Sequence, residues 1–318
     1  MIESNLVDRL FSADKLAVAR AISSVENQDG LHLELLNAIQ KKLGRAYRVG
    51  ITGPPGAGKS TIVSKLAKSL NDMGKRIAVI AVDPTSPFTG GALLGDRVRM
   101  MELSSRDGIF VRSMATRGSL GGLSKTTQLA ADVLDAAGFD YVFMETVGVG
   151  QSELDIVEAA DTTIVVLTPE SGDSVQAMKA GLMEIADFFV LNKADRPGVD
   201  QSYNAISTIL QISGHPAPGE AGENAWSPFI VKTVASENRG IDEVVKGIER
   251  HHRYLVDTDK LFSKRKERVR NVVFEIVGEN LRRKFWTEER LSELENKLEL
   301  VLSNKLSAVQ LAEELTKE

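Results

Sequence analysis

The sequence predicts a doubly wound α/β fold with a mostly parallel sheet, and three observations support this expectation. From residue 46 onward, short apolar runs alternate with segments of helical periodicity. The runs IAVIAV, TTIVVL and FFVLN are apolar at nearly every position, as in strands that are covered on both faces. A glycine-rich segment joins the first strand to the first helix that follows it, and this favours a ligand site at the carboxyl edge of the sheet.

Each element can be placed along the chain. In residues 1–45, leucine and isoleucine recur at helical spacing on both sides of an Asp29-Gly30 break, so we expect a helical extension that packs onto the main domain. Strands are expected at residues 47–52, 76–82, 109–114, 140–145, 162–168, 187–192 and 229–234. Helices are expected at residues 59–71, 122–137, 175–186, 198–213 and 240–255. The α/β domain is therefore expected to span residues 46–256.

The last segment, residues 257–318, predicts a helical arm. One long amphipathic helix is expected around Phe262 to Leu281, and another around Leu291 to Val301. The apolar stripes of such helices need a partner, and homo-oligomerisation is the favoured interpretation, with packing back onto the same chain as the alternative. A basic cluster is interpreted as a solvated helix face, and it contains Lys264, Arg265, Lys266, Arg268 and Arg270. His251 and His252 are interpreted as the cationic end of a helix rather than as metal ligands.

The composition excludes several classes of function. Without cysteine, the chain has no disulfide, thiolate zinc site, iron–sulfur cluster or cysteine nucleophile. Its 39 basic and 44 acidic residues give a formal net charge of −5, so no nucleic-acid partner is expected. It contains no apolar run long enough to span a membrane, and its first residues resemble neither a signal peptide nor a transit peptide. We therefore expect a cytoplasmic protein that does not associate with membranes.

A phosphate-binding loop is predicted between the first strand and the helix that follows. Residues 53–60, GPPGAGKS, fit the pattern G-x-x-x-x-G-K-[ST] in this setting. Glycines let backbone N–H groups surround a phosphate, and the helix N-terminus adds a positive dipole. Lys59 is expected to contact the β- and γ-phosphates, and Ser60 to hold Mg²⁺. The expected nucleotide contacts in this loop are Gly53, Pro54, Pro55, Gly56, Ala57, Gly58, Lys59, Ser60 and Thr61.

A second motif predicts recognition of guanine. In the sequence NKAD, residues 192–195, the Asp195 carboxylate can accept hydrogen bonds from N1–H and the 2-amino group of guanine, which adenine lacks. Asn192 can meet the other edge of the base, and the stem of Lys193 can pack over its face. The backbone after the next strand can contact the guanine carbonyl through Val234, Ala235 and Ser236. The expected ligands are therefore GTP and GDP.

A third motif lies at the end of the strand at residues 140–145. Glu145 is expected to hold Mg²⁺, through water, and the N–H of Gly148 to contact the γ-phosphate. The alternative is that Glu145 only caps the strand. Ras-like GTPases place glutamine directly after this glycine, whereas this chain has Val149. We therefore expect a slow intrinsic rate of hydrolysis.

Further carboxylates are predicted on the phosphate side of the sheet. Asp83 ends a strand, and Asp96 lies in a glycine-rich loop that is a candidate switch. Both are expected to act on the metal or its water, with turn or cap formation as the alternative. Asp173, Gln176 and Lys179 are spaced to share one helical face, and the alternative there is a capped helix start.

Six segments in this order resemble the MeaB/methylmalonic aciduria type A family of GTPases, some of which are called ArgK or LAO/AO transport ATPases. They are GPPGAGKST, AVDPTSPFTGGALLGDRVRM, SMATRGSLGGL, ETVGVGQSE, SGDSVQAMKAG and NKAD, and the strong resemblance covers residues 45–250. The resemblance implies a P-loop GTPase of the SIMIBI class, G3E-like in fold. It also implies a homodimeric chaperone that gates loading of adenosylcobalamin and protects or reactivates an acyl-CoA mutase, chiefly methylmalonyl-CoA mutase.

The resemblance also assigns roles to residues. It implies that Lys59 and Ser60 serve the phosphates and Mg²⁺, and that Asp195 reads guanine. Asp83, Asp96 and Glu145 would serve the metal and the switches, and the segment at residues 173–179 would signal to the mutase. Pro87, Phe88 and Ala92 depart from other members of the family, so the identity of the mutase stays open.

Three alternatives remain at this point. A nickel-delivery GTPase would need cysteine and histidine ligands, and the absence of cysteine and of any histidine-rich tract disfavours it. A kinase or ATPase of an amino-acid (LAO/AO) transport system is the second alternative, although no kinase catalytic-loop pattern is present. The third is a binding module in which hydrolysis is incidental.

Overall fold

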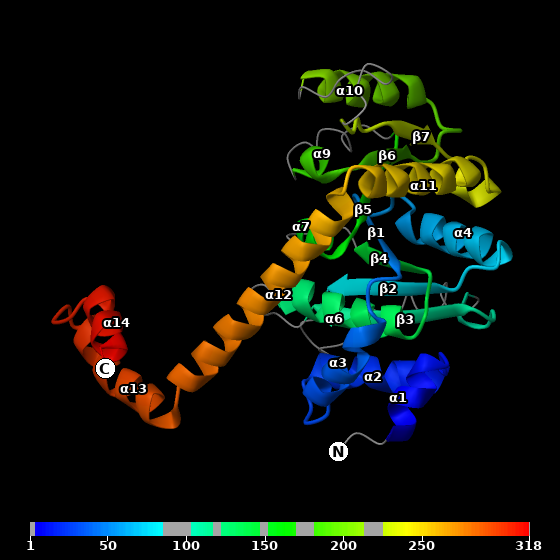
Figure 1. Cartoon of the computed structure of the whole chain (residues 1–318). Helices are drawn as coiled ribbons and strands as arrows, with labels where there is room; N and C mark the ends of the chain where they lie inside the picture. The colour runs from blue at the N-terminus through cyan, green and yellow to red at the C-terminus, as the bar shows by residue number, and fades with distance from the viewer. Residues whose placement is uncertain are drawn as a thin grey trace. The chain divides into compact units, whose positions relative to one another are not determined.

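The fold is known from a computed structural model, which describes residues 4–84, 103–116, 122–146, 152–169, 181–212 and 225–317 (Figure 1). For residues 4, 83–84, 115–116, 122–124 and 152–155 the description covers the backbone only. The chain divides into two compact units, residues 1–265 and residues 266–318. This division lies inside a helix and later in the chain than the domain boundary predicted after residue 256.

The first unit contains a sheet of seven strands in the order β3-β2-β4-β1-β5-β6-β7, and every neighbouring pair in it is parallel. The strands are β1 (Tyr47–Thr52), β2 (Ile77–Pro84), β3 (Ile109–Thr116), β4 (Tyr141–Thr146), β5 (Thr162–Leu167), β6 (Phe188–Leu191) and β7 (Ile230–Lys232). The predicted doubly wound parallel fold is confirmed. The central strand β1 lies between β4 and β5, so the loop that leaves β1 emerges at the switch point of the sheet.

Helices cover both faces of this sheet. On one face α4 (Lys59–Asp72) and α11 (Ile241–Asp257) contact each other and share a core with Phe143 and Phe188. On the other face α6 (Gly122–Ala136) and α7 (Ser152–Ala159) share a core with β2 and β4. A third apolar cluster joins β5 and β6 to α9 (Leu182–Ile185) and α10 (Val199–Ile212).

The N-terminal helices pack against α6 within the first unit through the second and third of them, and the first packs on those two. They are α1 (Ser4–Phe11), α2 (Lys15–Asn27) and α3 (His32–Ile39), followed by the short helix η1 (Gln40–Lys42). The chain breaks between α1 and α2 because Asp14 caps α2, accepting the Ala17 N–H at 2.9 Å. The sequence pattern did not locate this break, since apolar residues keep helical spacing on both sides of it.

In the residues that the structure describes, the second unit consists of helices joined by short turns. It holds the greater part of α12 (Lys260–Phe285), together with α13 (Glu288–Leu302) and α14 (Ala308–Thr316). The sequence analysis missed α14, which begins with a capping box between Ser307 and Gln310. Within the described ranges, no helix combines the length and the apolar character needed to span a lipid bilayer.

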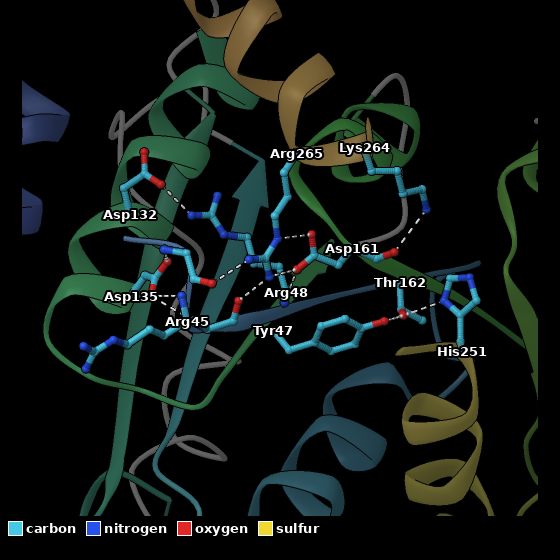
Figure 2. Close-up of polar contacts among 12 residues, drawn as sticks. Arg45, Tyr47, Arg48, Asp132, Asp135, Asp161, Thr162, His251, Lys264 and Arg265 are labelled. Carbon is cyan, nitrogen blue, oxygen red and sulfur yellow. Dashed lines mark hydrogen bonds and ion pairs between the residues drawn. The ribbon is translucent and has the colours of Figure 1, made fainter. Parts of the chain in front are cut away.

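A buried chain of polar groups lies at the amino edge of the sheet (Figure 2). The Tyr47 hydroxyl lies 2.5 Å from Thr162 Oγ1, which lies 2.7 Å from His251 Nδ1. The other ring nitrogen of His251 lies 3.3 Å from Asp187 Oδ1. Burial, helped by the charge of Lys264, lowers the pKa of His251 to about 3, so the ring is neutral. The interpretation of this histidine as a cationic helix end is wrong, because α11 continues to Asp257 and the ring is buried.

Acidification is expected to destabilise the protein through His251. Between its folded pKa of about 3 and the ordinary value of 6.5, the unfolded chain binds a proton that the folded chain does not. The free energy of unfolding should therefore fall by about 1.4 kcal/mol per pH unit below pH ~6.5. Urea denaturation at pH 7 and pH 5 measures this effect, and in His251→Asn the difference between the two pH values should shrink by about 2 kcal/mol. An unchanged pH dependence in that variant would contradict the assignment.

Candidate nucleotide-binding site

The glycine-rich loop connects the central strand β1 to helix α4, as the motif predicted. Gly53 has φ +136°, and a Cβ atom on it would lie 2.1 Å from the carbonyl oxygen of Val166 in β5. The loop therefore passes over β5 so closely that only glycine fits at this position. Pro55 and Gly56 form its exposed turn, whereas Ala57 is buried. The N-terminus of α4 follows directly, with Gly58 as its N-cap.

Replacement of Gly53 by alanine is expected to lower the free energy of unfolding by about 2 kcal/mol or more, because the left-handed backbone and the contact with Val166 both oppose a Cβ atom. Gly56→Ala is the matched control. It also has positive φ, +76°, but nothing lies within 4 Å of its Cβ position, so a loss of about 1 kcal/mol is expected. Urea denaturation of both variants tests the difference. Equal losses would mean that the close approach to β5 carries no energy.

Lys59 extends across the inside of this loop. Its ammonium group donates hydrogen bonds to the carbonyl oxygens of Gly53, at 2.6 Å, and Pro54, at 3.0 Å. The side chain is 5 % exposed, so its charge is placed among backbone groups rather than in water. A buried cation held at the first turn of a helix, inside a ring of backbone groups, is suited to binding a phosphate.

Ser60 and Glu145 meet beside the loop, as the sequence predicted for two metal ligands. The Ser60 hydroxyl donates to Glu145 Oε1 at 2.5 Å, from the first turn of α4 to the end of β4. Glu145 is 5 % exposed. A hydroxyl and a carboxylate that lie side by side next to the phosphate loop form an oxygen donor set of the kind that Mg²⁺ prefers.

A second contact joins the end of β4 to the loop. The Thr146 hydroxyl donates to Thr52 Oγ1 at 3.0 Å, and both side chains are buried. Thr52 is the last residue of β1 before the loop, and Thr146 follows Glu145. Two consecutive residues of β4 therefore hold both ends of the phosphate loop. Thr146 binds Thr52 before the loop, and Glu145 binds Ser60 after it.

Asn192 connects three segments of the site. Its amide nitrogen donates to the Ala57 carbonyl oxygen at 2.8 Å, and its Oδ1 accepts from the Thr233 hydroxyl at 3.0 Å and from the Ala235 N–H at 3.1 Å. The side chain is 3 % exposed. The structure shows this amide linking the phosphate loop to the segment after β7, and its predicted contact with the base stays a prediction. No local signal in the sequence could reveal this link, because the three segments lie far apart along the chain.

The predicted guanine-recognition residues gather at the same edge of the sheet. Lys193 has φ +57°, which turns the chain, and the Ala194 N–H donates to the Thr233 carbonyl at 3.0 Å. The Asp195 side chain is exposed at this turn. Beside it, Val234 and Ala235 are buried and Ser236 is exposed, at the start of the short helix η2 (Ala235–Glu237).

Several predicted site residues are not placed by the structure. The backbone of Asp83 lies at the carboxyl end of β2, beside the end of β4, but its side chain is outside the description. Asp96, Gly148, Asp173, Gln176 and Lys179 lie outside the described residues altogether. Their roles stay predictions.

A parallel sheet whose central strand leads into this phosphate loop, beside an exposed Asp195 after β6, defines the class of P-loop GTPases. The chain belongs to the MeaB family, because the family model described as "Methylmalonyl Co-A mutase-associated GTPase MeaB" matches residues 18–290. The resemblance stated from the sequence is thus confirmed, and so is GTPase activity as the enzymatic class.

Known relatives agree with this assignment. A protein of Pyrococcus horikoshii that is named as a GTPase is 47% identical over 309 residues, covering 97% of this chain and 95% of the relative. The "methylmalonic aciduria type A homolog, mitochondrial" of Mus musculus is 31% identical and covers 99% of this chain and 80% of its own length. A crystal structure of a "LAO/AO transport system kinase" matches with a TM-score of 0.73 at 28% identity, covering 99% of this chain and 98% of that one.

Proposed function

We propose that this GTPase is the chaperone of an adenosylcobalamin-dependent acyl-CoA mutase, with methylmalonyl-CoA mutase as the leading candidate. The observation that carries the proposal is the match of residues 18–290 to a family described as associated with that mutase. The similarity to the Mus musculus methylmalonic aciduria type A homolog over nearly the whole chain supports it further. In this role the protein gates cofactor loading in the cytoplasm and protects or reactivates the mutase.

The phosphate end of the site supports binding of GTP with Mg²⁺. Ser60 and Glu145 would hold the ion, with Asp83 and Asp96 as the further candidates from the sequence. When bound, Mg²⁺ neutralises charge that develops on the transferred phosphoryl group. Lys59 would exchange its bonds to Gly53 and Pro54 for contacts with phosphate oxygens.

The base end of the site supports selection of guanine. Asp195 is exposed at a turn that backbone hydrogen bonds fix to the segment after β7, so its carboxylate can accept both donors of the guanine edge. The stem of Lys193 would cover the face of the base, and the backbone at Ser236 would meet its carbonyl group.

Slow intrinsic hydrolysis is part of the proposal. Val149 stands where Ras-like GTPases carry the glutamine that orients water, so the mutase would have to complete the catalytic arrangement. The segment with Asp173, Gln176 and Lys179 would then report the nucleotide state to the mutase.

The second unit supports a homodimer. Large apolar side chains are exposed at four-residue intervals along α12, including Val273, Val277 and Leu281, which are 52%, 48% and 62% exposed. Such a stripe on a long helix suits a copy of itself. The charges are complementary as well, since α12 ends in three basic residues and α13 contains five glutamates.

GTP turnover, measured alone and with an excess of the acyl-CoA mutase of the same organism, tests the proposal. Stimulation of at least about tenfold, absent in Lys59→Ala, is expected if the mutase completes the site. GTP labelled at the γ-phosphate distinguishes a GTPase chaperone from a kinase. The chaperone releases the label as phosphate, whereas the kinase transfers it to a protein. An unstimulated rate with no complex on gel filtration, or label on a transport protein, would overturn the chaperone role.

A further inference from the structure

Two basic residues in the first turns of α12, Lys264 and Arg265, bind residues at the amino edge of the sheet (Figure 2). The Arg265 guanidinium donates to the carbonyl oxygens of Gly44, at 2.7 Å, and Ala46, at 2.9 Å, and binds Asp161 at 3.0 Å. Lys264 donates to the Asp161 carbonyl oxygen at 3.1 Å. The interpretation of these basic residues as a solvated helix face is therefore wrong for Lys264 and Arg265. It is also wrong for Arg268, which is buried.

Asp161 connects this helix to the central strand. It is fully buried directly before β5, and its carboxylate accepts the Arg48 N–H at 3.0 Å as well as the Arg265 contacts. In return, the Asp161 N–H donates to the Arg48 carbonyl oxygen at 2.8 Å. A buried carboxylate is costly when it loses a charged partner, so the position of Arg265 affects how Asp161 and β1 are held.

The same stretch of chain is bound to the end of α6. The Arg48 side chain, 5 % exposed, forms an ion pair with Asp132 at 2.5 Å. Asp135 accepts the N–H groups of Gly44, Arg45 and Ala46 at 2.6, 3.0 and 2.9 Å. Residues 44–48 thus lie between α6 and α12, and each helix binds them through charged side chains.

The other end of α6 faces the nucleotide edge. This helix begins at Gly122, soon after β3, and β3 ends at the carboxyl edge of the sheet. Its 15 residues correspond to roughly 22 Å. A helix of that length spans the distance from the nucleotide edge to residues 44–48, so its start lies at the nucleotide edge and Asp132 and Asp135 lie near its other end.

We propose that Arg48, Asp132, Asp135, Asp161 and Arg265, here called the base cluster, couple the root of α12 to the nucleotide bound at the opposite edge, with α6 as the connecting element. The nucleotide then determines how firmly the root of α12 is held. By reciprocity, a partner that displaces this root changes the relative affinities for GTP and GDP. The alternative is that the base cluster only anchors the helix. The proposal requires only GTP and GDP as ligands, so it stands apart from the identity of the mutase.

Hydrogen exchange of the full-length protein, with GDP and with a non-hydrolysable GTP analogue, tests the coupling. Amides in residues 44–48 and 258–265 are expected to differ by about fivefold in exchange rate between the two nucleotides. Arg265→Met should abolish that difference, whereas Arg270→Met, on an exposed position of the same helix, should keep it. The dissociation constant for GDP, measured by calorimetry, shows independently that each variant still binds nucleotide.

Two outcomes would overturn the coupling. One is equal exchange of these amides with either nucleotide in the unmodified protein, a measurement that needs no variant. The other is an unchanged nucleotide difference in Arg265→Met. If Arg265→Met does not fold, Arg265→Lys replaces it, because lysine keeps the charge beside Asp161 but cannot reach Gly44 and Ala46 together. This variant should reduce the difference in exchange rate between the two nucleotides at least about twofold.

Discussion

Replacement of Lys59 by alanine is expected to reduce GTP turnover by about 100-fold to 1,000-fold. The Lys59 ammonium is buried inside the phosphate loop, where it is hydrogen-bonded to Gly53 and Pro54 and positioned at the first turn of α4. A fixed cation in such a dry site stabilises charge that develops on phosphate oxygens during transfer, and removal of one such group typically costs this much. Release of phosphate under single-turnover conditions measures the change.

Lys65→Ala supplies the control for that experiment. Lys65 lies on the same helix, six residues further on, and belongs to no predicted nucleotide contact. It should retain turnover within about twofold, since surface substitutions away from a site change little. A loss smaller than tenfold in Lys59→Ala, with folding intact by circular dichroism, would show that this lysine does not carry the expected charge stabilisation.

Replacement of Asp195 by asparagine is expected to weaken GDP and GTP binding by about 100-fold and to create affinity for xanthosine nucleotides. The carboxylate can accept two hydrogen bonds from guanine, and loss of a charge-assisted pair costs about 3 kcal/mol. Asparagine instead presents one donor and one acceptor, which matches the 2-oxo group and N1–H of xanthine. Calorimetric titration with GDP and with xanthosine diphosphate measures both changes.

The matched control for this exchange is Asp200→Asn. Asp200 is also an exposed aspartate close in sequence, and its partner is Lys232 at 2.7 Å rather than a predicted base contact. It should leave the preference for guanine unchanged. If Asp195→Asn keeps its affinity for GDP and gains none for xanthosine diphosphate, guanine is read by other groups.

The strands and the phosphate loop could be predicted because each depends on residues close together in sequence. Buried parallel strands such as TTIVVL are apolar at consecutive positions, and the loop motif contains its own glycines and lysine. Ser60 and Glu145 were each predicted as Mg²⁺ ligands from their places at the carboxyl edge of a parallel sheet, and the structure brings the two side chains together.

Contacts between distant segments could not be predicted. The sequence pattern led to the interpretation of Arg265 as a solvated residue, but its guanidinium binds Asp161, which lies 104 positions earlier in the chain. Likewise, His251 looked like a helix end because nothing local indicated the buried chain through Thr162 and Tyr47. Burial decided the protonation state of His251, whereas the contact with Asp161 fixed the position of Arg265.

The amide of Asn192 has a consequence for nucleotide exchange. Two of its three hydrogen bonds go to Thr233 and Ala235 next to the guanine side, and the third goes to Ala57 in the phosphate loop. Withdrawal of the segment after β7 would break the first two bonds, so the amide would no longer be fixed in the orientation in which it binds Ala57. An exchange factor that acts at the guanine end is therefore expected to loosen the phosphate loop as well.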